Sequence, residues 1–172
     1  MYIAFFEDSP PRGRTSLPAN LRTPEAILTG KAANPYDVDI WAWGCLAFEL
    51  LAGYPLFFTG PNPAPAQKDD HHLLGVTAAL GPLPEDLYKS WKRSDRYFDE
   101  KRELFNSNTD GQGQVKFEQA SIETLFDRAQ VAVSEREANA IKKLLRRVLQ
   151  VDPAKRISVY EILQDHWFRR FI

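Results

Sequence analysis

One segment, residues 37–52, restricts the fold more than any other part of the sequence. Asp37 or Asp39 can accept hydrogen bonds from the free amides at the start of a helix there, and Gly53 ends that helix. Large apolar side chains occupy nearly all sides of it: Ile40, Trp41, Trp43, Leu46, Phe48, Leu50 and Leu51. A helix that is apolar all round must be covered on most sides, and Glu49 keeps the apolar run far shorter than the roughly 20 residues of a membrane span. We therefore expect a buried helix at the centre of the fold.

The overall composition is that of one ordinary globular domain. Of the 172 residues, 44% are hydrophobic and 26% are charged, and the net charge is -1. A chain of this length can bury a sizeable core, and the balanced charge favours neither nucleic acid nor a membrane as a partner. The single Cys45 can form no internal disulfide, and residues 1–8 lack the basic start of a secretory signal. We expect a protein of the cytoplasm or nucleus.

Outside the central helix, proline and glycine divide the chain into loops and helices. Residues 1–20 contain several of these residues without helical periodicity and predict an irregular loop, as do the prolines between residues 55 and 67. Helices are expected at about residues 68–80 and 84–92. Residues 94–113 are compatible with either short strands or coil.

The last third of the chain predicts two further helices. Ser134-x-x-Glu137 and Ser158-x-x-Glu161 both have the form of a capping box, in which Ser and Glu satisfy free amides reciprocally. Apolar residues after the first box recur every three or four positions from residue 138 to residue 149, which indicates one buried stripe. The basic residues between them fall on the opposite face and are interpreted as solvated surface.

Four segments resemble, in their order along the chain, the later landmarks of the protein kinase family. Residues 21–25 (LRTPE) are similar to the A-P-E motif that ends the activation segment, and residues 37–45 (DVDIWAWGC) resemble the D-x-W-x-x-G start of its central helix. Residues 149–156 (LQVDPAKR) resemble the D-P-x-x-R element, and residues 163–168 (LQDHWF) resemble the L-x-H-P-W-F terminus without its proline. Each motif alone is weak, whereas the ordered set is specific.

The resemblance implies a mainly α fold, namely the helical subdomain of a kinase C-lobe without the N-lobe and without the catalytic loop. Residues 1–20 would be a loop similar to an activation segment, and residues 21–172 a partial C-lobe. It also implies an ion pair between Glu25 and Arg156, because a buried carboxylate needs a cation and Arg offers two parallel hydrogen bonds. Asp39 would accept hydrogen bonds from the backbone of a catalytic loop.

Within the kinases, the sequence is most similar to the SR-protein kinase branch of the CMGC group. The resemblance places Leu21, Arg22 and Pro24 in the pocket just beyond the phosphorylated residue of a protein substrate. Asp69 and Asp70 are the nearest acidic candidates for docking Arg/Ser-rich substrates, which acidic groups recognise through guanidinium hydrogen bonds. The alternative interpretation, which is at least as well supported, is that both acids only stabilise the N-terminus of a helix.

The residues that perform phosphoryl transfer in this family have no counterpart in the sequence. The transfer needs a phosphate-binding Lys, an H-R-D-x-x-x-x-N loop and a D-F-G Asp for magnesium, and none of these motifs occurs. We therefore assign no catalytic, cofactor-binding or metal-binding residue, and expect ATP and magnesium only in a full-length kinase. The three histidines have no zinc-site spacing.

Two functions follow as hypotheses. The first is part of a serine/threonine kinase that is inactive alone and retains the substrate-binding side, with a protein substrate or the missing N-lobe as partner. The alternative is a non-catalytic protein-binding module derived from a kinase C-lobe, which would bind through surfaces normally covered by the rest of the domain.

Overall fold

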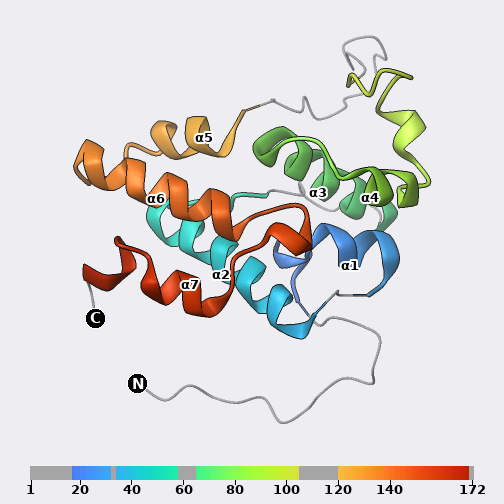
Figure 1. The fold of residues 1–172 in the computed structure, drawn as a ribbon. Helices are drawn as coiled ribbons and strands as arrows, with labels where there is room; N and C mark the ends of the chain where they lie inside the picture. Colours follow the sequence, from blue (N-terminus) through green and yellow to red (C-terminus); the bar gives the residue numbers. More distant parts are fainter. Residues whose placement is uncertain (1–16, 32–33, 58–64, 105–119, 171–172) are drawn as a thin grey trace.

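The computed structural model describes residues 17–31, 34–57, 65–104 and 120–170 (Figure 1). Within these ranges the fold is mainly α, as expected. The α-helices are α1 (Pro24–Thr29), α2 (Pro35–Ala52), α3 (Pro65–Leu80), α4 (Glu85–Ser90), α5 (Ile122–Arg128), α6 (Glu135–Val148) and α7 (Val159–Gln164). Short 3-10 turns are η1 (Ala19–Leu21), η2 (Ser94–Arg96), η4 (Pro153–Lys155) and η5 (Phe168–Arg170).

Side-chain caps explain where several helices begin. Asn34 caps α2 by accepting a hydrogen bond from the amide of Tyr36, so the expected role of an Asp at this helix start falls to an Asn. The capping box at Ser158 is complete, because the Glu161 carboxylate accepts from the Ser158 amide. At α6 only the Ser134 half is present.

Helix α2 forms the centre of the core, and α6 and η1 pack against it (Figure 1). Trp41 and Phe48 on α2 have no exposed surface. The expectation that α2 is covered on most sides is only partly met, however, because Leu46 is 45% exposed and Leu50 is 86% exposed. These two residues are four positions apart and therefore share one face of the helix. The described residues thus leave an apolar strip of α2 in contact with solvent.

The close approach of α2 and α6 depends on a glycine. A Cβ atom at Gly44 would lie 2.7 Å from Val148 and 2.8 Å from Leu149. We predict that Gly44→Ala lowers the free energy of unfolding by about 1–3 kcal/mol through overpacking, measured by urea denaturation. Gly75→Ala is the matched control, because its nearest neighbour is Phe57 at 3.6 Å and alanine is the better helix former. A Gly44→Ala protein as stable as the Gly75→Ala protein would contradict this packing.

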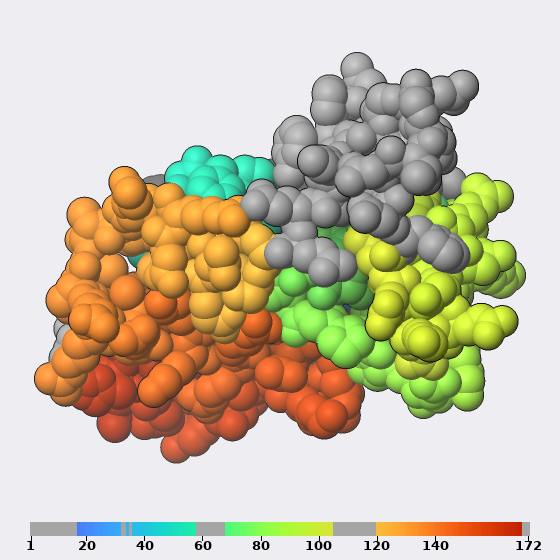
Figure 2. Space-filling view, turned by 90° about the horizontal axis from the view of Figure 1, so that it is seen from above, coloured from blue at the N-terminus to red at the C-terminus, as the bar shows by residue number. Residues whose placement is uncertain are grey.

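The remaining segments lie to either side of this core. Figure 2 shows α5 and α6 on one side of the molecule and α3, α4 and the chain that follows them on the other. Of residues 94–113, the described part up to residue 104 has η2 and an isolated antiparallel bridge between Phe98 and Leu104, and belongs to no sheet. Residues 1–16 of the loop expected at residues 1–20 lie outside the described residues. Of the other four, residues 19 and 20 belong to η1.

The basic face of α6 is paired with acidic side chains. Lys142 contacts Asp127 at 2.8 Å, and Arg147 contacts Asp165 at 3.0 Å. The 45% exposed Arg147 agrees with the interpretation as solvated surface. Lys142 is only 16% exposed and Arg146 donates to the carbonyl of Leu80, so these two side chains are partly buried. In the part of the chain that the structure describes, no helix is long and apolar enough to cross a membrane.

Candidate functional site

The candidate site is built around residues 21–25, called the anchored segment below. It joins η1 to α1, and the Thr23 side chain caps α1 by accepting from the amide of Ala26 at 3.2 Å. Thr23 has no exposed surface. Pro24 occupies the first turn of the helix, where a backbone N–H would have no acceptor within the helix, so the missing N–H of proline costs no hydrogen bond. Local sequence therefore ends the loop and starts a helix at a defined residue.

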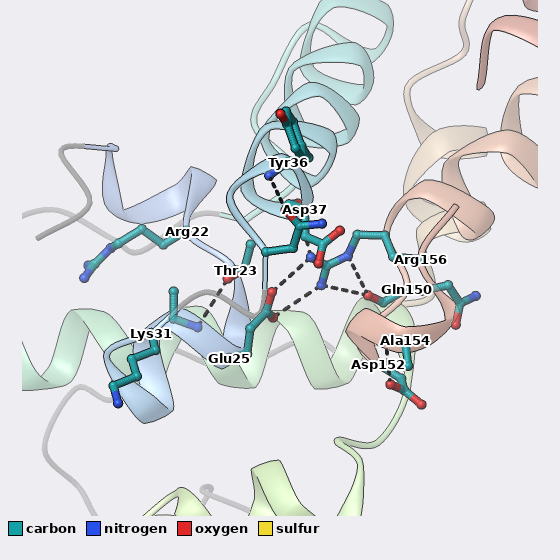
Figure 3. Close-up of polar contacts among 12 residues, drawn as sticks. Arg22, Thr23, Glu25, Lys31, Tyr36, Asp37, Gln150, Asp152, Ala154 and Arg156 are labelled. Carbon is teal, nitrogen blue, oxygen red and sulfur yellow. Dashed lines mark hydrogen bonds and ion pairs between the residues drawn. The ribbon is translucent and has the colours of Figure 1, made fainter. Parts of the chain in front are cut away.

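One end of the anchored segment is tied to the last third of the chain by an ion pair. Arg156 donates from Nη1 to Glu25 Oε1 at 3.0 Å and from Nη2 to Oε2 at 3.3 Å (Figure 3). The two residues are 131 positions apart in sequence, and only 4% of Glu25 and 8% of Arg156 is exposed. The structure thus brings together the two residues that the sequence assigned to this pair.

All five N–H groups of Arg156 have acceptors. Besides Glu25, they donate to the carbonyl of Asp37 at 3.1 Å and to the carbonyl of Gln150 at 3.1 and 3.2 Å. The guanidinium also lies 5.0 Å from the centre of the Trp41 ring, a cation–π distance. Because every donor is used, the desolvation cost of the buried cation is offset as fully as the geometry allows.

The other end of the anchored segment is tied to α3. Arg22 donates from Nη2 to Asp69 Oδ1 at 2.8 Å, and the Arg22 carbonyl lies 2.9 Å from Nε2 of His72. Figure 3 shows the Arg22 side chain directed away from the pair of Glu25 and Arg156. Two residues assigned to substrate binding, Arg22 and Asp69, therefore pair with each other.

Asp70 has a different environment from the one expected for a docking residue. It is only 2% exposed, and its carboxylate accepts from Trp91 at 2.9 Å, from Arg93 at 2.7 and 2.9 Å and from Tyr97 at 3.0 Å. Burial, followed by the bond to Asp70, raises the pKa of Tyr97 to about 12. In this structure Asp70 holds the chain after α4 against α3 and presents no carboxylate to a substrate.

The other assigned residues are distributed between core and surface. Leu21 is 9% exposed and belongs to the hydrophobic core, and Pro24 is also buried. Asp39 is exposed on α2. Its role toward a catalytic loop stays a prediction, as do the substrate contacts of Leu21 and Pro24.

His72 is a site residue that the sequence did not reveal. It is 1% exposed, and burial lowers the pKa of its ring to about 4, so the imidazole is neutral near pH 7. Its partner, the Arg22 carbonyl, is 50 positions away, and no short motif connects the two. Among the described residues, no group of three His, Cys, Asp or Glu side chains could hold a metal ion.

Comparison with known proteins identifies the fold. A family model described as the protein kinase domain matches residues 17–168. The chain belongs to the protein kinase family. Cyclin-dependent kinase 8 of Caenorhabditis elegans is 31% identical over 157 residues, which cover 87% of this chain and 24% of that kinase.

Two further kinases are similar over the same part. The human dual specificity protein kinase CLK2 is 30% identical over 149 residues, covering 87% of this chain and 27% of that protein. The human dual specificity tyrosine-phosphorylation-regulated kinase 4 is 28% identical over 152 residues, covering 87% of this chain and 25% of that protein. The similarity is thus to CMGC kinases, and the chain spans about a quarter of the length of these relatives.

Proposed function

We propose that this part of a kinase domain forms the substrate-binding side of a protein serine/threonine kinase. The observation that carries the proposal is the anchored segment, whose two ends are tied to separate elements by buried contacts at Arg156 and His72. Such a segment presents its backbone in one conformation, which positioning of a protein substrate requires. The partly exposed Arg22 and Asp69 side chains lie at its edge.

The residues of this chain do not fit ATP and magnesium. The sequence contains neither the phosphate-binding Lys nor the H-R-D and D-F-G motifs, and the described residues offer no cluster of metal-binding side chains. The proposal therefore assigns binding to this chain and derives no step of phosphoryl transfer through it. Transfer of a phosphoryl group from ATP is proposed for the longer kinase domain only.

A second function is favoured by a separate observation. Leu46 and Leu50 expose an apolar strip of α2, the central helix of the fold. Exposed apolar strips of this kind mark protein-interaction surfaces. A non-catalytic module would bind a protein partner, or the remainder of a kinase domain, through this strip.

Finer assignments rest on fewer residues. Membership of the SR-protein kinase branch stays a prediction, supported by the sequence Asp69-Asp70-His71-His72-Leu73. A role of Asp69 in docking Arg/Ser-rich substrates is proposed with it, because its carboxylate is 31% exposed. A cytoplasmic or nuclear location is proposed by the same resemblance.

The two functions can be separated by titrating the isotope-labelled chain with peptides and following backbone amide chemical shifts. We expect an Arg/Ser-repeat peptide to shift the backbone amide signals of residues 21–23 and of Asp69, and a Lys/Ser-repeat peptide of equal charge to shift them less. Shifts restricted to α2 around Leu46 and Leu50 would favour the binding module. An absence of any shift with either peptide would contradict the substrate-binding proposal.

A further inference from the structure

Helix α3 holds Arg22 at two points. Asp69 binds the Arg22 side chain and His72 binds its carbonyl, and these two residues are three positions apart on α3. Residues at this spacing lie on the same side of a helix, one turn apart. The backbone and the side chain of Arg22 are therefore held by neighbouring groups of one rigid element.

The two contacts differ in their exposure to solvent. The ion pair of Arg22 and Asp69 leaves 26% and 31% of the side chains exposed, and such pairs contribute little to stability. His72 is 1% exposed, so its bond to the Arg22 carbonyl forms away from water. The ion pair of the Arg22 side chain is thus accessible to water, although Nε of this guanidinium is buried without a hydrogen-bond partner among the described residues. The Arg22 carbonyl is held away from water.

The chemistry of His72 assigns the direction of this bond. A carbonyl oxygen can only accept, so Nε2 carries the proton and donates. Nδ1 is then an acceptor, and it is buried with no hydrogen-bond partner among the described residues. A buried unsatisfied acceptor is costly, and an apolar side chain would avoid that cost. The Nε2 bond is the contact that an apolar residue could not provide.

The ring of His72 also belongs to an aromatic stack that reaches the other end of the anchored segment. It packs edge-on against Phe57 with 5.0 Å between ring centres, and Phe57 stacks on Trp41 at 5.9 Å and 11°. Trp41 in turn lies under the guanidinium of Arg156, which binds Glu25. Both ends of the anchored segment are therefore fastened to one continuous set of packed rings.

We propose that His72 is a positioning residue for substrate binding, which sets the backbone of the anchored segment by donating from Nε2 to the Arg22 carbonyl. This inference rests on the proposed substrate-binding function. In this proposal His72 does not contact the substrate but fixes the backbone conformation in which residues 21–24 bind it. The partly exposed pair with Asp69 is the weaker of the two contacts of Arg22.

Hydrogen exchange in two variants tests the proposal. His72→Leu keeps an apolar volume without a donor, and His72→Gln keeps an N–H donor at a similar reach. The readout is exchange at the hydrogen-bonded amides of Leu21, Ala26 and Ile27 relative to amides of α6. We expect exchange at the first three to become roughly tenfold faster in His72→Leu with α6 unchanged, and to return toward the original rate in His72→Gln.

Several outcomes would overturn the inference. One is an unchanged rate of amide exchange at Leu21, Ala26 and Ile27 in His72→Leu. The others are an equally faster exchange throughout the chain in His72→Leu, and exchange in His72→Gln that stays as fast as in His72→Leu. If His72→Leu does not fold, ring nitrogen shifts of the unmodified protein decide, because a proton on Nδ1 alone contradicts the proposed donor. Asp69→Asn serves as the control and should leave these amides nearly unchanged, because its contact is partly exposed.

The exchange experiment contains no peptide, so its failure is distinct from failure of the proposed function. Normal peptide shifts with unaltered exchange in His72→Leu would remove the role of His72 alone. Absent peptide shifts with the expected exchange pattern would keep His72 as the anchor and remove the substrate assignment.

Discussion

Arg156→Met should lower the free energy of unfolding by about 3–5 kcal/mol, because it leaves the Glu25 carboxylate buried without a cation. The same change removes the donors to the carbonyls of Asp37 and Gln150 and the cation over Trp41. Urea denaturation followed by far-UV circular dichroism measures the effect. The large loss is expected because the cost is that of an uncompensated buried charge, not the modest net value of an ion pair.

A double-mutant cycle supplies the control for this prediction. Glu25→Leu with Arg156→Met removes both charges, so the double variant should be more stable than the sum of the two single losses implies. Arg147→Met, which breaks a pair with Asp165 at the surface of α6, should cost at most about 1 kcal/mol. Equal losses for Arg147→Met and Arg156→Met would contradict the buried pair as the tie between the two halves of the chain.

Asp70→Ala is the second change for which a large effect is expected. It removes a carboxylate that accepts four hydrogen bonds. These come from the N–H of Trp91, the guanidinium of Arg93 and the hydroxyl of Tyr97. We expect a loss of about 2–3 kcal/mol, since the buried N–H of Trp91 loses its acceptor and the 37% exposed Arg93 side chain loses its bonds to Asp70. Thermal or urea unfolding measures the loss, and the side-chain NMR signal of the Trp91 indole N–H, which donates to Asp70, should shift.

The adjacent acid is the matched control for Asp70. Asp69→Ala breaks only the partly exposed pair with Arg22, and its expected cost is at most about 1 kcal/mol. If Asp70→Ala were as mild as Asp69→Ala, the assignment of Asp70 to the interior would be wrong. Weakened binding of an Arg/Ser peptide by Asp69→Ala alone would separate a docking residue from a structural one.

The family and the class of fold were predictable from the sequence. Motifs such as residues 21–25 and 149–156 occur in the same order as in the kinase family. Several motifs in the family's order are less easily explained by coincidence than any single one. The mainly α fold was confirmed, and α2 contributes to the core, although Leu46 and Leu50 on it are exposed. Helix starts were predictable where a cap is local, as at Ser158, whose partner Glu161 is three positions away.

The roles of neighbouring polar residues were not predictable in the same way. Asp69 and Asp70 are adjacent and chemically identical, yet one is partly exposed and the other is buried. A helix turns by about 100° per residue, so which of the two faces inward depends on where α3 packs. That position is set by contacts with Trp91 and Tyr97, more than 20 positions along the chain.

Membership of the kinase family, the core position of α2 and the pairing of Glu25 with Arg156 could all be predicted from residue order alone. The bond from His72 to the Arg22 carbonyl, the burial of Asp70 and the exposure of Leu46 and Leu50 became visible only in the folded chain. Motifs and caps can be found in a sequence because they depend on residues close together in the chain or shared by the whole family. Burial and hydrogen-bond partners instead depend on which distant surfaces meet when the helices pack.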